Sequence, residues 1–287
     1  MSVDILKREF KIFQKDFFDL LKTENELPSF LIDYLKSSSG KRIRPILGRL
    51  FVKSCGKNLN KNQKRLLLVV ELIHNASLIH DDVIDNSEIR RGEKSLNTKF
   101  DNSLAISCGD LLLSVAMKEL VKITSSNVRE YCTKLMSEIC LGEIDQYFCK
   151  NKIPSINEYL EKSRKKTALL FEIAVVGVAK LMRETKFEKI AQEFSKNFGI
   201  AFQLKNDLID IQTKKEDYKD GIYTAAVIYE NEFSGKITQE LSECTIEKSK
   251  SLTDNYLDRA IKALNKLESN QFRDVLIDFT KQLKEKK

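Results

Sequence analysis

The sequence predicts an all-α protein, and two observations support that prediction. Its 287 residues include only 10 glycines and 3 prolines, far fewer turn residues than β-sandwiches or Rossmann-type folds need. Apolar residues also recur at steps of three and four along most of the chain, as in Leu66, Val69, Val70 and Ile73, which is the spacing of one helix face. Hydrophobic residues make up 42% and charged residues 32%, a composition that argues against disorder.

The helical pattern forms long segments before about residue 222 and shorter ones after it. The longer predicted helices cover residues 2–22, 28–37, 42–55, 60–85, 103–121, 126–149, 155–182 and 186–211. The shorter ones cover residues 223–233, 236–249, 252–267 and 269–285. Pro28, Pro45 and Pro154 fall where helices are expected to begin, because a missing N–H costs little there. There is no fixed-period repeat or low-complexity linker, so we expect a single domain over 1–287 with polar breaks near 86–99 and 212–222.

Charge and cysteine usage exclude several classes of protein. The formal net charge is +7, but the lysines are scattered along helices, so we expect solvated faces, some attraction to anionic substrates and no nucleic-acid partner. The six cysteines contain no CxxC pair and there are only two histidines, which argues against a zinc site. The longest apolar stretch, Leu66–Ile73, is too short to span a bilayer. With no visible signal peptide, we expect a cytoplasmic protein with free cysteines.

Two clusters of carboxylates end long predicted helices. Like charges four residues apart repel, and a helix C-terminus is already partly negative, so each cluster calls for a counter-cation. Oxygen ligands with no His or Cys among them favour Mg²⁺ or Mn²⁺. The candidate metal ligands are Asp81, Asp82 and Asp85 in the first cluster, and Asn206, Asp207 and Asp210 in the second.

Basic residues accompany these clusters. Arg90-Arg91-Gly92 follows the first cluster, and Gly40-Lys41-Arg42-Ile43-Arg44-Pro45 opens an early predicted helix. Arginine forks and a lysine charge suit phosphate oxygens. Taken alone, the second segment is equally typical of a solvated basic turn. Beside two aspartate clusters it becomes a candidate phosphate pocket, although it lacks the glycine spacing of a P-loop.

Taken together, these segments resemble the trans-type polyprenyl diphosphate synthases, and most closely the bacterial long-chain, octaprenyl-type synthases, over about residues 38–230. Residues 71–92 look like the family's first aspartate-rich motif with its arginines, residues 40–45 like its isopentenyl diphosphate motif, and residues 206–210 like its second aspartate-rich motif. Four shorter matches fall in the family's order: Gly109-Asp110, Gly142-Glu143 with Gln146, Lys166-Thr167-Ala168 and Phe202-Gln203.

The resemblance implies an isoprenoid-synthase-like helical bundle with a deep central cavity, usually a homodimer. It implies a Mg²⁺-dependent prenyltransferase in which an allylic diphosphate ionises and the double bond of isopentenyl diphosphate attacks the resulting carbocation. The ionisation step needs the charge on the leaving group to be stabilised. The carbocation also needs a dry cavity, because water would react with it. A long apolar product also implies a possible peripheral membrane contact for its release.

The resemblance further implies a role for each matching residue. The candidate metal ligands named above would hold Mg²⁺ that bridges the allylic diphosphate, and Arg90 and Lys166 would neutralise the same diphosphate. Thr167 and Gln203 would turn oxygen dipoles toward the carbocation; the alternative for both is ordinary helix packing. Small residues at Ala76 and Ser77 would let the product grow long. The residues that would bind isopentenyl diphosphate are Lys41, Arg44, His74 and Arg91, although a lone histidine is more often a core residue.

Two departures from the family pattern keep alternatives open. Asn206 stands where the family usually has aspartate, so one metal could bind more weakly. The family's lysine-bearing GKxT pattern reads Gly221-Ile222-Tyr223-Thr224 here, and Lys214, Lys215 and Lys219 are candidate replacements. The alternatives are a short-chain farnesyl or geranylgeranyl diphosphate synthase and a non-catalytic partner subunit. A terpene cyclase would not need the isopentenyl diphosphate motif.

Overall fold

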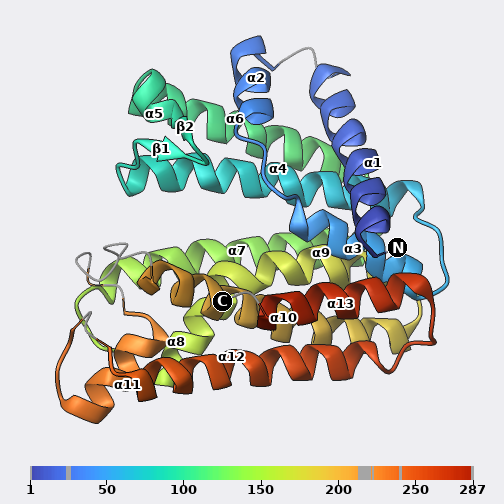
Figure 1. The fold of residues 1–287 in the computed structure, drawn as a ribbon. Helices are drawn as coiled ribbons and strands as arrows, with labels where there is room; N and C mark the ends of the chain where they lie inside the picture. Colours follow the sequence, from blue (N-terminus) through green and yellow to red (C-terminus); the bar gives the residue numbers. More distant parts are fainter. Residues whose placement is uncertain (1, 24–26, 213–220, 222, 239–240, 286–287) are drawn as a thin grey trace.

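The structure is a computed structural model that describes residues 2–23, 27–212, 221, 223–238 and 241–285, and these residues are almost entirely helical (Figure 1). The first half contains α1 (Ser2–Thr23), α2 (Ser29–Ser37), α3 (Ile43–Ser54), α4 (Lys61–Ile84), β1 (Ile89–Arg90), β2 (Glu93–Lys94), α5 (Leu96–Lys99) and α6 (Asn102–Val121). The second half contains α7 (Ser126–Phe148), α8 (Ile156–Ser163), the π-helical segment η1 (Arg164–Ala168), α9 (Leu169–Lys180), α10 (Thr185–Gln212), α11 (Ala225–Ser234), α12 (Glu243–Leu264) and α13 (Gln271–Glu285). The predicted all-α class is therefore confirmed.

Local capping explains where several helices begin and end. Asn60 accepts a hydrogen bond from the backbone N of Gln63 and donates its own backbone N–H to the Gln63 side chain, both at 2.9 Å, and this reciprocal cap starts α4. Ser155 and Glu158 form the same arrangement at the start of α8. Gly235 ends α11 with a left-handed φ of 70°, which glycine adopts without a steric penalty.

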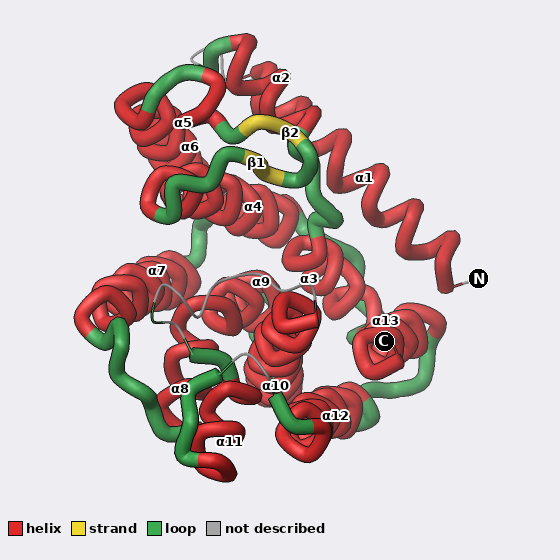
Figure 2. The backbone as a smooth tube through the Cα atoms, turned by 60° about the vertical axis from the view of Figure 1, so that its left-hand side comes forward, coloured by secondary structure: helices red, strands yellow, loops and turns green. Residues whose placement is uncertain are grey.

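The centre of the fold is α9, in which every residue from Leu169 to Ala179 except Glu172 is buried. It packs against α3, α4, α7 and α10. A helix that is apolar on all sides belongs in the interior of a protein. In Figure 1, α4 and α6 form an upper layer with the β1–β2 hairpin, while α10, α12 and α13 lie below α9; the rotated view of Figure 2 shows α8 and α11 grouped beside α10. The layers meet around α9, where the cavity described below opens.

The structure differs from the predicted elements in three places. The predicted helix over 155–182 is divided into α8, η1 and α9, because a π-turn adds one residue without interrupting the apolar pattern. The two predicted helices over 236–249 and 252–267 are one helix, α12, whose start is capped by Ser242 and which contains no glycine or proline. The polar break near 86–99 contains a hairpin whose two strands, β1 and β2, have two residues each, and the single-turn helix α5.

Within the described residues, none of the helices combines the length and the apolar character needed to cross a bilayer. The six cysteines are free, as expected.

Candidate active site

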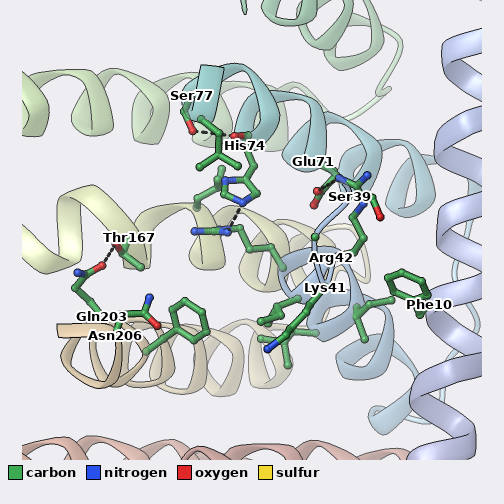
Figure 3. A pocket seen from close by; sticks show the side chains of 18 of the residues that line it. Phe10, Ser39, Lys41, Arg42, Glu71, His74, Ser77, Thr167, Gln203 and Asn206 are labelled. Atoms are coloured by element: carbon green, nitrogen blue, oxygen red, sulfur yellow. Dashed lines mark hydrogen bonds and ion pairs between the residues drawn. The ribbon is translucent and has the colours of Figure 1, made fainter. Parts of the chain in front are cut away.

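A cavity of about 1140 Å³ opens beside the central helix. Its walls come from α3 and the loop before it, from α4, from α7, from η1 and from α10, and residues of α1 and α13 line it as well. Figure 3 shows His74 and Ser77 of α4 on one wall and Thr167, Gln203 and Asn206 on the other, with Phe10 at the α1 end. Predicted site residues from six separate segments therefore line one space: Lys41, Arg44, His74, Ser77, Asp81, Arg91, Lys166, Thr167, Gln203 and Asn206.

The first aspartate cluster lies at the C-terminal end of α4. Asp81 lines the cavity, and burial raises the pKa of its carboxyl to about 6, with Lys166 acting in the opposite direction and Glu143 and Asp85 adding to the rise. Asp82 is buried and its Oδ1 accepts a hydrogen bond from Arg90 Nε at 2.8 Å. Arg90, expected on the allylic diphosphate, therefore neutralises Asp82 in this structure. Asp85 is the C-cap residue of α4 and is exposed.

The second cluster lies at the end of α10, across the cavity. Asn206 lines the cavity, while Asp207 is held by two donors from different elements. Gln203 Nε2 donates to Asp207 Oδ1 at 2.7 Å, and the hydroxyl of Tyr159 on α8 donates to Asp207 Oδ2. Burial and the Asp207 carboxylate raise the pKa of Tyr159 well above its ordinary value, so the phenol keeps its proton. Asp210, one turn further, is half-buried.

The two clusters fit a hard divalent cation. All six candidate ligands are oxygen donors, which suits Mg²⁺ or Mn²⁺. Asp82 Oδ2 is buried with no hydrogen-bond partner, so the lone pairs of this oxygen are available to a metal ion. Among the described residues, no three His, Cys, Asp or Glu side chains gather closely enough to form a metal site by themselves. Such clusters suit Mg²⁺, which proteins commonly bind through one or two carboxylates and the phosphates of a substrate.

A cationic group faces the cavity between the start of α3 and α4. Arg44 Nη1 lies 3.0 Å from His74 Nε2, and its guanidinium lies over the ring of Phe171 at 4.7 Å. Burial, followed by the charge of Arg44, holds the pKa of His74 well below its ordinary value. His74 is therefore neutral and its Nε2 accepts from Arg44. Burial also lowers the pKa of Arg44 to about 10, partly opposed by Glu71.

Arg91 joins this group through a close backbone approach. Its Nη1 donates to the carbonyl of Ser38 at 2.7 Å. A Cβ at Gly40 would come within 2.4 Å of the Arg91 guanidinium, so a larger residue there would displace the end of the Arg91 side chain. Lys41, next in sequence, is exposed at the cavity wall. The segment 40–45 and the hairpin therefore bring three cations and a neutral imidazole together.

The π-helical segment η1 supplies the remaining polar groups. Lys166 Nζ lies 3.3 Å from Glu143 Oε2 on α7, and Thr167 Oγ1 donates to Gln203 Oε1 at 2.6 Å. A Cβ at Gly199 would come within 2.5 Å of the Ala168 Cα, so this glycine lets α10 pass against η1. One turn later along α10, Gln203 reaches Thr167. Single π-turns are frequent at functional sites because they re-aim side chains.

The two candidate chain-length residues lie in different environments. Ser77 is half-buried and lines the cavity, whereas Ala76 is fully buried in the hydrophobic core. The same cavity is lined by apolar residues that include Ile73, Leu78, Ile139 and Leu170. An aromatic side chain at position 77 would therefore project toward the cavity, while one at position 76 would overpack the core.

Several predicted residues are placed elsewhere. Among the described residues, the cavity wall does not include Ala76, Asp82, Asp85, Arg90, Asp207 and Asp210. Lys214, Lys215, Lys219 and Ile222 lie outside the described residues. Two residues to which the sequence analysis gave no role support the site: Tyr159 contacts Asp207, and Arg42 pairs with Glu71. Tyr159 precedes Lys166 by two helical turns, a spacing that could have indicated it, whereas nothing local indicates the Arg42 pair.

Comparison with known proteins agrees with this geometry. The profile of the family described as Polyprenyl synthetase matches residues 26–270. A prenyl transferase of Cyanidium caldarium is 30% identical over 96% of this chain and 95% of its own length. The decaprenyl-diphosphate synthase of Dictyostelium discoideum is 34% identical over 89% of this chain, which spans 62% of that longer protein.

Solved structures show the same fold. Heptaprenyl diphosphate synthase from Staphylococcus aureus superimposes with a TM-score of 0.88, at 22% identity, over 98% of each chain. Geranylgeranyl pyrophosphate synthetase from the archaeon Geoglobus acetivorans gives a TM-score of 0.84 at 27% identity, over 98% of this chain and all of that one. The resemblance found in the motifs is thereby confirmed, and the chain belongs to the polyprenyl synthetase family.

Proposed function

We propose that this chain is a trans-prenyltransferase that condenses an allylic diphosphate with isopentenyl diphosphate, depends on Mg²⁺ or Mn²⁺, and makes a long-chain polyprenyl diphosphate. One observation carries the proposal: the first residue of each aspartate-rich cluster and the whole candidate isopentenyl diphosphate set line a single cavity with an apolar wall. Two phosphate-binding regions and a dry space between them are what a condensation of two diphosphates needs.

The residues divide the chemistry between the two walls. Divalent metal, when bound, stabilises the negative charge that develops on the departing pyrophosphate. Asp81, with Asn206 opposite, orients the allylic diphosphate, and Lys166 adds positive charge beside it. Arg44, Lys41 and Arg91 bind the second diphosphate. The allylic C–O bond breaks, the double bond of isopentenyl diphosphate forms the new C–C bond, and a proton leaves that carbon skeleton for the pyrophosphate.

Thr167 on η1 and Gln203 on α10 form a hydrogen-bonded pair that can stabilise the carbocation. Because Thr167 donates its hydroxyl proton to Gln203, the Thr167 oxygen has only lone pairs left for other partners. Thr167 lines the cavity, so an oxygen dipole meets the developing positive charge there. Ile139, Leu170 and Phe202 exclude water from the same region.

A long-chain product is supported by the small Ser77 on the cavity wall and by the relatives. The matched protein of Dictyostelium discoideum is named a decaprenyl-diphosphate synthase, and a human relative, 29% identical over 91% of this chain, an all trans-polyprenyl-diphosphate synthase. A short-chain product remains the alternative. Solved structures named geranylgeranyl pyrophosphate synthases have the same fold, so the fold alone does not separate the two.

The decisive experiment is incubation of the purified chain with an allylic diphosphate, isopentenyl diphosphate and Mg²⁺, followed by chromatography of the products. We expect long-chain products and none after chelation of the metal. Asp81→Asn should lower kcat by at least about a hundredfold, because leaving-group charge loses its stabilisation. Asp33→Asn, which changes an exposed aspartate on α2, is the matched control and should act as wild type. No condensation by the wild type would refute the proposal.

A non-catalytic partner subunit is the second candidate, and one observation favours it. Asn206 removes a charge from the second cluster, and two relatives are named component 2 of heptaprenyl diphosphate synthases. Under this alternative the chain alone would bind diphosphates without turnover, which the same product assay distinguishes.

We propose a homodimer on the basis of an apolar surface on α7. Leu141, Ile144, Tyr147 and Phe148 are all more than half exposed and lie along one side of the helix. Contiguous apolar exposure of this kind marks contact surfaces. Sedimentation equilibrium of the wild type and of Ile144→Lys tests the proposal: the wild type should have twice the mass of the chain and the variant should dissociate.

Three further expectations stay predictions. One is that residues 1–287 act as a single domain, and another is a cytoplasmic location. The third is a peripheral membrane contact for release of the product, for which co-sedimentation with phospholipid vesicles, before and after product synthesis, is the direct measurement.

A further inference from the structure

We infer that Tyr159 is a positioning residue: together with Gln203 it holds Asp207 in the orientation that the second metal-binding cluster needs. The inference rests on the proposed function and assigns a role to a residue outside every motif named above. Tyr159 is only 4% exposed, and its ring packs with apolar residues of α10 and α11. Its hydroxyl nevertheless reaches the Asp207 carboxylate, 48 residues further along the chain.

The donor and the acceptor of each of these hydrogen bonds follow from the chemistry of the groups. A carboxylate only accepts, so Gln203 turns its amide nitrogen toward Asp207 Oδ1 and its carbonyl toward Thr167. The Tyr159 hydroxyl donates to the other oxygen, Oδ2. Hydrogen bonds thereby connect four residues on three segments: Tyr159 on α8, Thr167 on η1, and Gln203 and Asp207 on α10.

The same geometry leaves Asp207 able to bind a metal ion. An ionised carboxylate has about four acceptor positions, and Tyr159 and Gln203 occupy one on each oxygen. These two donors restrict rotation of the carboxylate, and a divalent cation would meet Asp207 in that orientation. Such outer partners commonly orient the ligands of a metal. Here the neighbouring Asn206 contributes no charge, so the orientation of Asp207 has a larger effect.

The test is metal binding by the full-length chain, measured by calorimetry with Mg²⁺ titrated in the presence of inorganic pyrophosphate. Tyr159→Phe keeps the ring in its apolar surroundings and removes only the donor. We expect the apparent Kd for Mg²⁺ to rise about tenfold. Tyr131→Phe removes a hydroxyl from α7 and is the matched control, with an unchanged Kd.

Kinetics and a double-mutant cycle separate positioning from a general structural effect. Tyr159→Phe should lower kcat and leave KM for isopentenyl diphosphate unchanged, since Lys41, Arg44 and His74 lie on other segments. In an Asp207→Asn background, Tyr159→Phe should have no further effect on Mg²⁺ binding, because it acts through Asp207. A Kd equal to wild type in Tyr159→Phe, or full additivity with Asp207→Asn, would overturn the inference.

A second variant covers the case in which Tyr159→Phe does not fold. Gln203→Met removes the other donor to Asp207 and should raise the Kd for Mg²⁺ in the same way; an unchanged Kd contradicts the proposed orientation of Asp207. The titration uses pyrophosphate alone. The Mg²⁺ titration therefore tests this inference even if the product assay shows that the wild-type chain does not condense its substrates.

Discussion

Arg42 and Glu71 form a buried ion pair that connects the candidate diphosphate-binding loop to the middle of α4. Arg42 Nη1 lies 2.5 Å from Glu71 Oε1, and both side chains are almost completely buried. The guanidinium also lies over the ring of Phe17, 4.8 Å from its centroid. Arg42 has a left-handed φ of 50°, which is uncommon for a residue other than glycine. The pair therefore fixes an unusual backbone turn between Lys41 and Arg44.

We expect Arg42→Ala to destabilise the fold by about 3–5 kcal/mol, because it leaves Glu71 buried without its partner. It should also raise KM for isopentenyl diphosphate more than KM for the allylic substrate, since Lys41 and Arg44 flank the turn. Urea unfolding and steady-state kinetics measure the two effects. Lys36→Ala, which breaks an exposed ion pair with Asp33, should cost at most about 1 kcal/mol. An equally small cost for Arg42→Ala would contradict the prediction.

A double variant separates stability from substrate binding. Arg42→Met with Glu71→Leu replaces both charges by apolar groups, and such replacements of buried pairs are often neutral. Most of the stability should return, while KM for isopentenyl diphosphate stays high because the turn loses its specific partner. If the stability and the KM for isopentenyl diphosphate both return to their wild-type values, the pair has no role in substrate binding.

The second prediction concerns Asn206, which lines the cavity beside Asp207. An amide oxygen can bind Mg²⁺ but adds no negative charge. Asn206→Asp should therefore lower the Mg²⁺ concentration that gives half-maximal rate. Asn127→Asp, at an exposed position on α7, should leave this concentration unchanged. A raised requirement in Asn206→Asp would mean that the asparagine is not a ligand, or that the site does not accept another charge.

The fold was predictable because helix formation follows a local pattern. Apolar residues at steps of three and four, with caps such as Asn60, determine most helices to within a few residues. The β1–β2 hairpin escaped prediction because two-residue strands have no recognisable period. The π-turn at η1 escaped as well, because one inserted residue changes the direction of Lys166 without changing the composition of the helix.

Short motifs were enough to indicate residues that the fold brings to one place. Asp81, Arg44 and Thr167, which belong to three different motifs, all line the same cavity. The residues that support them were not predictable, because their partners are distant in sequence: Arg42 reaches Glu71 across 29 positions. That Arg90 pairs with Asp82, and that Ala76 lies in the core, also depend on three-dimensional packing.

The third prediction concerns product length. Ser77→Phe should place a ring in the cavity that Ser77 lines, and so shorten the product while leaving the first condensation largely intact. Chromatography gives the chain-length distribution. Ser251→Phe, at an exposed position of α12, is the matched control. Long chains from Ser77→Phe would mean that the growing tail does not pass this residue. A wild type that stops at farnesyl or geranylgeranyl diphosphate would refute the long-chain assignment.

The last prediction concerns stability in acid. Glu9 on α1 is fully buried, and its carboxylate accepts hydrogen bonds from Arg49 Nε at 3.0 Å and from Lys53. Burial alone would raise the pKa of Glu9, but the hydrogen bond from Lys53 and the charges of Arg49 and Lys53 outweigh it and lower the pKa. α1 and α3 are thereby joined, and residues of α1 line the cavity.

A carboxyl whose pKa is lower in the folded than in the unfolded chain stabilises the fold above its unfolded pKa, which is about 4.3 for glutamate. That contribution is lost as the pH falls through the lowered folded value. The free energy of unfolding of the wild type should therefore decline below about pH 5. Glu9→Gln should be less stable at pH 7, by about 3–5 kcal/mol, and should decline less steeply in acid. Urea unfolding at pH 7, 5 and 4 measures both, with exposed Glu268→Gln expected to follow the wild type. Equal slopes for the wild type and Glu9→Gln would show that Glu9 does not contribute to the acid sensitivity.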